Sequence, residues 1–288
     1  MIGWSRMRTE QEIFDLIINY ATSNERIRAV YMNGSRANPN STRDKYMDFD
    51  IVYVVKDFET FISDSTWIDI FGERLMLQMP EAMRNPDGSG HFNWQMLFTD
   101  GNRIDLTLIP YEKQELIQQD SATIVLLDKD SILPNFPPAS DNDYLIKPPN
   151  KLFYDSCCNN FFWCMQNVAK GIVRNEFPYA IGMYNYIISA ELNDMLSWYI
   201  GCENNFTVSS GKMGKYFKRY LTGDLYEQYI NLYSINGNYD DFWECVFNAC
   251  DLFRYIAKQV GMTLKYDYNS KDDEGIMKYL KAMKNQVK

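Results

Sequence analysis

The sequence is poor in the residues that build transition-metal sites. Its 288 residues include a single histidine, His91, and six cysteines, none of which forms a CxxC pair. Zinc sites draw closely spaced ligands from cysteine and histidine. The composition therefore disfavours a zinc site. We interpret the six cysteines as reduced, mostly buried residues of a cytosolic protein.

Long apolar runs are also missing. No stretch approaches the roughly 20 consecutive apolar residues that a membrane-spanning helix needs. The N-terminus, MIGWSRMRTE, lacks the apolar core of a secretion signal. We therefore expect a cytoplasmic protein with no membrane partner.

Positive charge is scarce. Lys and Arg together number 29 against 38 Asp and Glu, which leaves a net charge of −9. Proteins that bind nucleic acid usually present a basic face to the phosphates, so we expect no nucleic-acid partner. An acidic cleft instead concentrates cations, and this suits a polycationic small substrate. The alternative is that the acidic charge only keeps the protein soluble.

The predicted secondary structure changes near the middle of the chain. Residues 9 to about 130 alternate helix-like and strand-like segments, residues 131–150 are rich in Pro, Asn and Asp, and helical periodicity follows. We therefore predict a first domain of mixed helices and strands, residues 1–135, and a helical domain, residues 150–288. The cleft between two such domains is the expected ligand site.

Local signals predict individual elements. Thr9 and Glu12 form a T-x-x-E capping box that opens a helix, and Asp57 is a candidate cap for a later one. Strands are predicted at 27–32, 49–55, 74–79, 93–98 and 103–109. Helices or helix pairs are predicted at 151–173, 177–201, 212–234, 239–262 and 272–286.

Three aspartates stand out because they occur in strand-like segments. Asp48 and Asp50 flank Phe49 and point to the same face of a strand, and Asp105 lies between Ile104 and Leu106 in a later strand. Strands are depleted in aspartate, and paired carboxylates repel each other unless a cation neutralises them. Oxygen ligands of this kind suit Mg²⁺, which takes the rest of its shell from water and substrate phosphates. The aspartates therefore predict a magnesium site that serves a nucleotide.

A short motif after the first strand completes the pattern. Gly34 lets backbone amides approach a phosphate, Ser35 adds a hydroxyl donor, and Arg36 can add a charged hydrogen bond. Alone, a Gly-Ser pair means nothing, and a lone D-x-D fits solvent-facing acids on an edge strand. The ordered set, Gly-Ser, twelve residues, D-F-D and then a strand with a central Asp, is restrictive.

This ordered set resembles the DNA polymerase β-like nucleotidyltransferase superfamily. Within it, the chain is similar to the aminoglycoside 6-adenylyltransferases, also called streptomycin adenylyltransferases, from about Met7 to the C-terminus. The stretches that carry the resemblance include ERIRAVYMNGSRAN, DFDIVYVV, FGERLMLQMPE, MLFTDGNRIDLTLIP, CCNNFFW and GKMGKYFKRYL. The resemblance implies an α+β fold, in which a nucleotidyltransferase domain with a small mixed β-sheet flanked by helices precedes an all-α helical bundle.

The resemblance also implies roles for the aspartates. Asp48 and Asp50 would hold one or two Mg²⁺ ions, and Asp105 would either complete the metal site or act as general base on the attacking hydroxyl. The general base is thus left open between these roles.

The nucleotide is assigned to two segments. Gly34, Ser35 and Arg36 would bind the triphosphate of ATP, the co-substrate. Lys212 and Lys215 would reach the phosphates from a helix of the second domain. For these lysines the alternative is an ordinary solvated helix face.

Three residues are candidates for binding the acceptor. Trp94 could stack on a ring, with core packing as the alternative, and Asp155 and Glu176 could meet cationic groups, with helix capping or surface positions as the alternative. The chain departs from its relatives at Asn33, where they usually carry an acid, and at two positions after Asp155, where DSCCNNFFW replaces a more acidic motif.

These features lead to a functional hypothesis. The protein is expected to move AMP from MgATP to a hydroxyl of an aminoglycoside, the 6-hydroxyl of streptomycin in the first instance, and so to give antibiotic resistance. One alternative is the same chemistry on a lincosamide or a protein. Another is a non-catalytic nucleotide-binding homologue. The acceptor, and whether the protein is a monomer or a homodimer, stay open.

Overall fold

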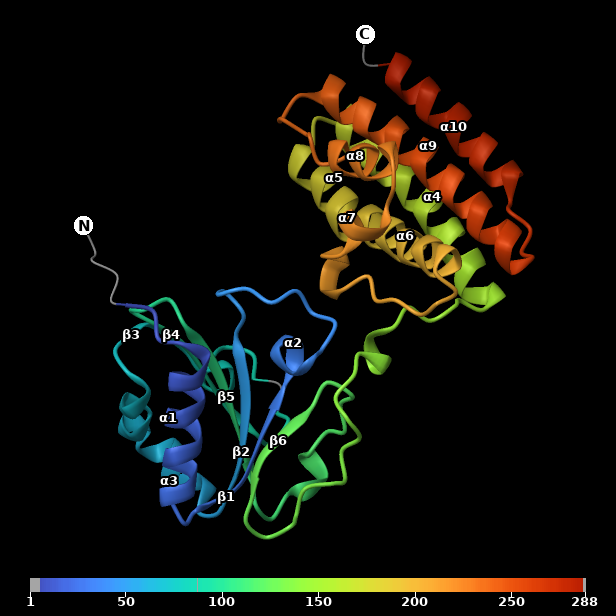
Figure 1. Ribbon diagram of the computed structural model, residues 1–288. Coiled ribbons are helices and arrows are strands. Elements are labelled where there is room, and N and C mark those ends of the chain that lie inside the picture. Colours follow the sequence, from blue (N-terminus) through green and yellow to red (C-terminus); the bar gives the residue numbers. More distant parts are fainter. Residues whose placement is uncertain (1–5, 87, 287–288) are drawn as a thin grey trace. The chain divides into compact units, whose positions relative to one another are not determined.

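The computed structural model describes residues 6–86 and 88–286. The chain forms two compact units, Met1–Asp143 and Tyr144–Lys288, called here the N-terminal unit and the helical unit (Figure 1). Each unit has its own hydrophobic core. The predicted α+β class, a mixed sheet with flanking helices followed by a helical region, is confirmed.

The N-terminal unit is built on a six-stranded mixed sheet with the strand order β3-β4-β5-β2-β1-β6. β2 and β5 run parallel, whereas the other neighbours are antiparallel. The strands are β1 (Ile27–Asn33), β2 (Phe49–Val55), β3 (Arg74–Gln78), β4 (Phe92–Phe98), β5 (Arg103–Pro110) and β6 (Ile124–Asp128). All five predicted strands are present.

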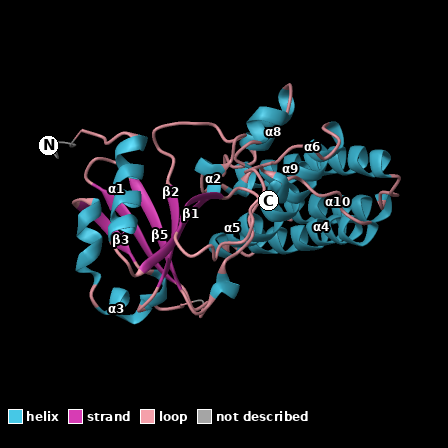
Figure 2. Cartoon of the chain, turned by 60° about the horizontal axis from the view of Figure 1, so that its bottom comes forward, coloured by secondary structure: helices cyan, strands magenta, loops and turns pink. Residues whose placement is uncertain are grey.

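Helices cover one face of this sheet (Figure 2). The predicted capping box is confirmed, because the Thr9 hydroxyl accepts from the Glu12 amide and the Glu12 carboxylate accepts from the Thr9 amide. The helices of the unit are α1 (Glu10–Ser23), α2 (Gly34–Ala37) and α3 (Phe58–Ser63), with 3₁₀ turns at Ser65–Phe71, Pro80–Ala82, Gln114–Leu116 and Asn142–Tyr144.

Side-chain alternation along β2 decides which residues face these helices. Phe49, Ile51 and Tyr53 belong to the core under α1. Val52 and Val54 belong to a smaller apolar cluster on the opposite face. Because strand side chains alternate, Asp50 lies on that second face.

Two local predictions need correction. β6 was not predicted, because this short edge strand is half exposed and lacks an alternating pattern. Asp57 occupies the position before α3, but its backbone is left-handed (φ 54°) and its side chain makes no capping hydrogen bond.

The helical unit contains long helices packed against one another (Figure 1). At its centre the rings of Phe161 and Phe253 stack with centroids 3.8 Å apart. The helices are α4 (Lys151–Val173), α5 (Phe177–Met183), a π-helical turn (Tyr184–Ile188), α6 (Ser189–Glu203), a 3₁₀ turn (Lys212–Gly214), α7 (Phe217–Tyr220), α8 (Asp224–Asn231), α9 (Tyr239–Leu264) and α10 (Ser270–Asn285).

The predicted helical segment at 212–234 is broken into short pieces. Gly211 has φ 70° and Met213 has φ 57°, and a right-handed helix cannot pass through residues in these conformations. The other four predicted helical segments are confirmed within a few residues.

The composition led to expectations about the cysteines and the helices. All six cysteines lie within the described residues and are free, and five of them are buried. In the described part of the chain, no helix combines the length and the apolarity needed to cross a bilayer.

A buried carboxylate ties the chain before α1 to the turn between β4 and β5. Asp100 accepts hydrogen bonds from the Arg8 guanidinium at 2.5 Å and from the Asn102 side-chain amide at 3.0 Å. Burial alone would raise the pKa of Asp100, but the bonds from Arg8 and Asn102 outweigh it and hold the pKa well below its usual range. Ionised Asp100 therefore stabilises the fold.

We predict that Asp100→Asn lowers the unfolding free energy at pH 7 by about 3 kcal/mol, the usual cost of breaking a buried ion pair. The folded-state pKa of Asp100 is depressed. The loss of unfolding free energy in the variant is therefore full above the unfolded pKa of about 4, and it shrinks as the pH falls below that value. Urea unfolding at pH 7 and pH 3 measures this. Glu25→Gln, at an exposed carboxylate, is the control, and an equal effect of both variants would contradict the prediction.

Candidate active site

Five polar side chains form a row across the open face of the sheet. The strand pairings place Asn33 opposite Asp50, Asp50 opposite Asp105, Asp105 opposite Gln95, and Gln95 opposite Gln78. Residues directly opposite each other in a ladder present their side chains on the same face. The row therefore brings together two of the aspartates that the sequence separates by more than fifty positions.

Asp48 precedes the first residue of β2 and joins this group through an arginine. The Arg103 guanidinium donates to both oxygens of Asp105, from Nε to Oδ1 at 2.7 Å and from Nη2 to Oδ2 at 2.6 Å. Its Nη1 lies 3.5 Å from Asp48 Oδ2. Asp48 and Asp105 thus share one cation, whose charge also acts on Asp50.

Sequence reasoning missed Arg103. Its signal was the i, i+2 spacing to Asp105 in the same strand, which puts both side chains on one face. A bidentate arginine fixes the plane of a carboxylate as well as its charge. Arg103 therefore orients Asp105.

The single positive charge of Arg103 does not balance the negative charges of Asp48, Asp50 and Asp105. Burial, followed by the charges of Asp105 and Asp48, raises the pKa of Asp50 to about 6. Burial also raises the pKa of Asp48, although Arg103 lowers it in part. A further cation beside Asp48 and Asp50 would relieve this cost.

Gly34 sits directly against Asp50. Its φ is 77°, and a Cβ at this position would lie 2.2 Å from Asp50 Oδ2. No other residue fits there without moving the carboxylate. The end of β1 therefore needs glycine so that the backbone of the Gly-Ser turn can approach the carboxylates.

The expected phosphate role of Arg36 is wrong in this structure. The side chain is 5% exposed, and its guanidinium donates to the carbonyl oxygens of Asp48 (3.2 Å) and Met47 (2.5 Å). It also pairs with Glu10 at 2.8 Å and lies 3.8 Å from the centre of the Phe49 ring. Arg36 thus holds the chain before β2, and so the backbone of Asp48, in place.

The remaining residues of the turn take up different positions. Ser35 is half-buried in the first turn of α2. Asn33, where relatives usually carry an acid, accepts a hydrogen bond from the Thr123 hydroxyl at 2.9 Å. Because Asn33 is paired with Asp50, an acid there would add another carboxylate to an already crowded row.

The expectation that Trp94 stacks on an acceptor ring is also wrong. Trp94 is 0% exposed, and its ring packs against Trp67 and Phe92 at centroid distances of 5.4 and 4.5 Å. It belongs to the core on the helix-covered face of the sheet. The alternation of β4 explains this, since Gln95 takes the open face and its neighbour Trp94 takes the opposite one.

The other predicted residues lie in the helical unit. Asp155 forms an ion pair with Lys151 at 2.7 Å, and Glu176 is the exposed residue before α5. Glu176 lies beyond the end of α4, and its amide donates to the Gly171 carbonyl at 2.8 Å. Gly171 follows Asp155 by sixteen residues of helix, so at about 1.5 Å per residue the two acids lie roughly 24 Å apart. Asp155 and Glu176 therefore cannot grip one sugar ring together.

Lys212 and Lys215 are exposed; Lys212 begins the 3₁₀ turn of the helical unit and Lys215 directly follows it. The Lys215 ammonium lies 5.1 Å from the centre of the Tyr216 ring. Their reach to the phosphates stays a prediction.

The chemistry of the donor set fits Mg²⁺. This ion is typically held by one or two protein carboxylates together with substrate phosphates and water, and Asp48 and Asp50 form such a pair. Within the described residues, no group of three or more His, Cys, Asp or Glu side chains is arranged to hold a metal by itself. This agrees with the position of Arg103 on both oxygens of Asp105.

A mixed sheet that presents a Gly-Ser turn beside strand-borne carboxylates defines a nucleotidyltransferase. Comparison with known proteins narrows this class. The profile of one family, described as streptomycin adenylyltransferase, matches residues 7–283. The chain belongs to this family, and it is an adenylyltransferase.

Its relatives match along nearly their full length. An aminoglycoside 6-adenylyltransferase of Bacillus subtilis (strain 168) is 40% identical over 286 residues, which cover 98% of this chain and 100% of that protein. One of Campylobacter jejuni is 40% identical over 270 residues, 93% of each chain. One of Staphylococcus aureus is 36% identical over 270 residues, 91% of this chain and 94% of that protein.

One solved structure is also similar. It is the crystal structure of an aminoglycoside 6-adenyltransferase from Bacillus subtilis, at 36% identity, a TM-score of 0.48 and a coverage of 96% of this chain and 99% of that chain.

We predict that Asp50→Asn stabilises the metal-free protein at pH 7.5 by about 1 kcal/mol, after discounting for solvent screening. The folded-state pKa of Asp50 is raised to about 6. Its contribution to stability is therefore complete below the unfolded pKa of about 4 and is lost as the pH rises through 6. The variant escapes this loss.

Thermal unfolding in EDTA at pH 4 and pH 7.5 measures the difference, with Glu59→Gln as the exposed-acid control. A variant less stable than the wild type at pH 7.5 would refute the assignment of Asp50 as an uncompensated carboxylate.

A second prediction concerns the Arg103 ion pair. Arg103→Met and Asp105→Asn should together cost less stability than the sum of the single changes, with a coupling of about 1 kcal/mol for a half-exposed bidentate pair. Urea unfolding of the four proteins in the cycle gives this value. Strict additivity would show that the contact contributes nothing in solution.

Proposed function

We propose that this adenylyltransferase moves AMP from MgATP to a hydroxyl of an aminoglycoside, with the 6-hydroxyl of streptomycin as the first candidate, and so gives antibiotic resistance. The observation that carries the proposal is the register of β2 and β5, which sets Asp50 beside Asp105 next to the Gly-Ser turn. The names of the relatives supply the acceptor class. The net charge of −9 agrees with a cationic acceptor.

The nucleotide would lie at the end of β1. Gly34 and Ser35 would offer a backbone amide and a hydroxyl to the triphosphate, and Lys212 and Lys215 would add positive charge. Asp48 and Asp50 would hold Mg²⁺, which neutralises the phosphate charge and aligns the oxygens when it is bound. Arg36 would keep the backbone of Asp48 in position through its carbonyl contacts.

The reaction would be an in-line substitution at the α-phosphorus of ATP. The acceptor oxygen forms a bond to that phosphorus, the bond to the bridging oxygen of the β-phosphate breaks, and pyrophosphate leaves. Asp105 would take the hydroxyl proton, because each carboxylate oxygen keeps a free lone pair while it accepts from Arg103. Arg103 would act as a positioning residue by fixing the plane of that carboxylate.

Substitutions in the helical unit favour a second candidate, the same transfer to another acceptor such as a lincosamide or a protein. Ser156 and Asn160 stand where the family motif carries acids, and the Asn160 amide donates to Glu191 at 2.6 Å. An amide that binds a carboxylate of its own chain replaces a group able to meet a cationic acceptor.

The proposal predicts a mass increase on one drug. We expect streptomycin, in a panel with spectinomycin, kanamycin and lincomycin, to gain the mass of AMP when it is incubated with the protein, ATP and Mg²⁺, with one pyrophosphate released per transfer. Asp50→Asn should lower the rate by roughly 10²- to 10³-fold or more. Mass spectrometry of the drugs and a pyrophosphate assay provide the measurement.

The Glu59→Gln variant and a reaction with EDTA are the controls. Modification of lincomycin alone would favour the second candidate. Tight ATP binding without pyrophosphate release, with every drug of the panel and with the protein itself unmodified, would instead support a non-catalytic nucleotide-binding homologue.

A further inference from the structure

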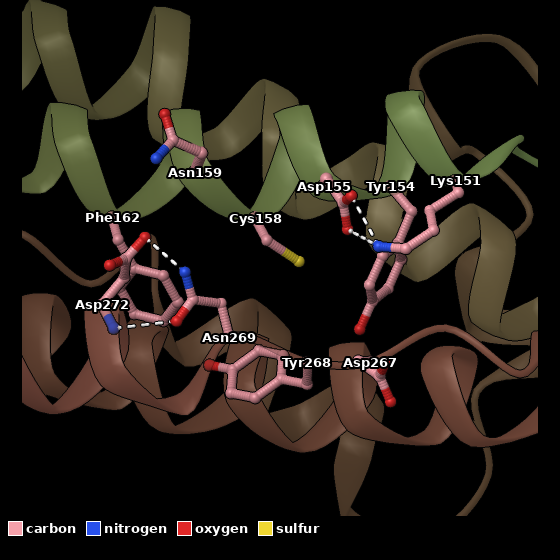
Figure 3. A pocket seen from close by; sticks show the side chains of 10 residues that line it. All are labelled: Lys151, Tyr154, Asp155, Cys158, Asn159, Phe162, Asp267, Tyr268, Asn269 and Asp272. Carbon is pink, nitrogen blue, oxygen red and sulfur yellow. Dashed lines mark hydrogen bonds and ion pairs between the residues drawn. The ribbon is translucent and has the colours of Figure 1, made fainter.

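A cavity of about 370 Å³ lies within the helical unit (Figure 3). One wall is the first half of α4, and the other is the segment from Asp267 to Asp272 that leads into α10. This volume falls at the lower end of the range of small-molecule sites. The lining includes none of the three aspartates of the candidate active site and no residue of the Gly-Ser turn.

Hydrogen bonds fix two aromatic side chains that line the cavity. The Tyr154 hydroxyl donates to the Ala257 carbonyl at 2.8 Å, and the Tyr268 hydroxyl donates to Asp273 Oδ2 at 2.9 Å. Asp273 is itself held by the Arg254 guanidinium. Phe162 is 3% exposed and adds a ring without polar atoms. The rings thus keep their places before any ligand arrives, which lowers the entropic cost of binding.

The charges at the rim are unbalanced. Lys151 pairs with Asp155 at 2.7 Å and neutralises it. Asp272 accepts the Asn269 amide at 2.7 Å, a neutral donor. Asp155 has the larger effect in raising the pKa of Lys151, and the exposed carboxylate of Asp267 lies close enough to this ammonium for its charge to raise that pKa further. Three aspartates, Asp155, Asp267 and Asp272, thus share one lysine beside the aromatic rings, and such a cavity favours an organic cation.

Two further features define the ligand. Burial raises the pKa of Cys158 to about 12, so the cavity presents a neutral thiol and not a thiolate. The Lys258 ammonium lies 5.4 Å from the centre of the Tyr268 ring, so this ring already takes part in one cation–π contact. The chemistry suits a ring that bears ammonium or guanidinium groups, with an apolar face for the aromatic side chains.

We infer that this cavity binds a cationic ring of the acceptor, with its ammonium or guanidinium group between Asp267 and Asp272 and its apolar face on Tyr268 and Phe162. The inference rests on the proposed function and names its recognition site. It includes Asp155, which lines the cavity, and leaves out Glu176, which lies beyond the other end of α4 and does not line the cavity.

The test uses the full chain with two kinds of change at the cavity. Asp267→Asn combined with Asp272→Asn removes the charge at the same size, and Asn159→Trp places a large ring at the exposed lining residue of α4. Glu203→Gln combined with Glu244→Gln removes two exposed acids elsewhere on the same unit and is the matched control. Thermal unfolding shows whether each protein is folded.

We expect the charge variant and the tryptophan variant each to raise the KM for streptomycin about tenfold, which corresponds to about 1.4 kcal/mol. The KM for ATP and the kcat should stay within about twofold in both, because rim contacts change acceptor binding without touching the reacting atoms. The control should match the wild type.

Calorimetric titration of streptomycin into the full chain without ATP separates the inference from the proposed function. A tenfold weaker affinity in both cavity variants supports the site even if no drug is adenylylated. Unchanged affinity and unchanged KM in both folded variants, or an equal loss in the control, overturns it.

Discussion

The parallel pairing of β2 with β5 is the constraint on which the site depends. It aligns Asp50 with Asp105, residues distant in sequence, and the alternation of both strands sends their side chains away from the helices. Phe49 and Ile51 fill the core on the covered face, so a slip of one residue would bury the carboxylates and expose the core. The same burial that stabilises the sheet thus holds the acids on its open face.

Close approach around these acids explains several other features. Gly34 must lack a side chain because Asp50 occupies the space beside it. The Arg36 guanidinium donates to two backbone carbonyls just before β2 and lies over the Phe49 ring. Arg103 donates to Asp105 and so fixes the orientation of its carboxylate. The two arginines near the aspartates therefore have different structural roles. One positions backbone, and the other positions a carboxylate.

The acidic side chains of the helical unit have different surroundings. Its core is aromatic and apolar, whereas the cavity beside α4 combines fixed tyrosines with three aspartates that share one lysine. In the N-terminal unit the acids stand in a strand ladder that suits a metal and phosphates. In the helical unit they stand over aromatic rings that suit an organic cation. Each unit thus offers one kind of recognition.

The sequence by itself determined the class of fold and the positions of β1 to β5 along the chain, and it singled out Asp48, Asp50 and Asp105, because side-chain periodicity and an aspartate within a strand are local properties. Only the tertiary structure decided the environments of Arg36 and Trp94, whereas the contact of Arg103 with Asp105 follows from their spacing in β5. Which partner the Arg36 guanidinium or the Trp94 indole meets depends on residues far away in the chain. Burial and close approach arise only when the strands pair, so no local pattern encodes them.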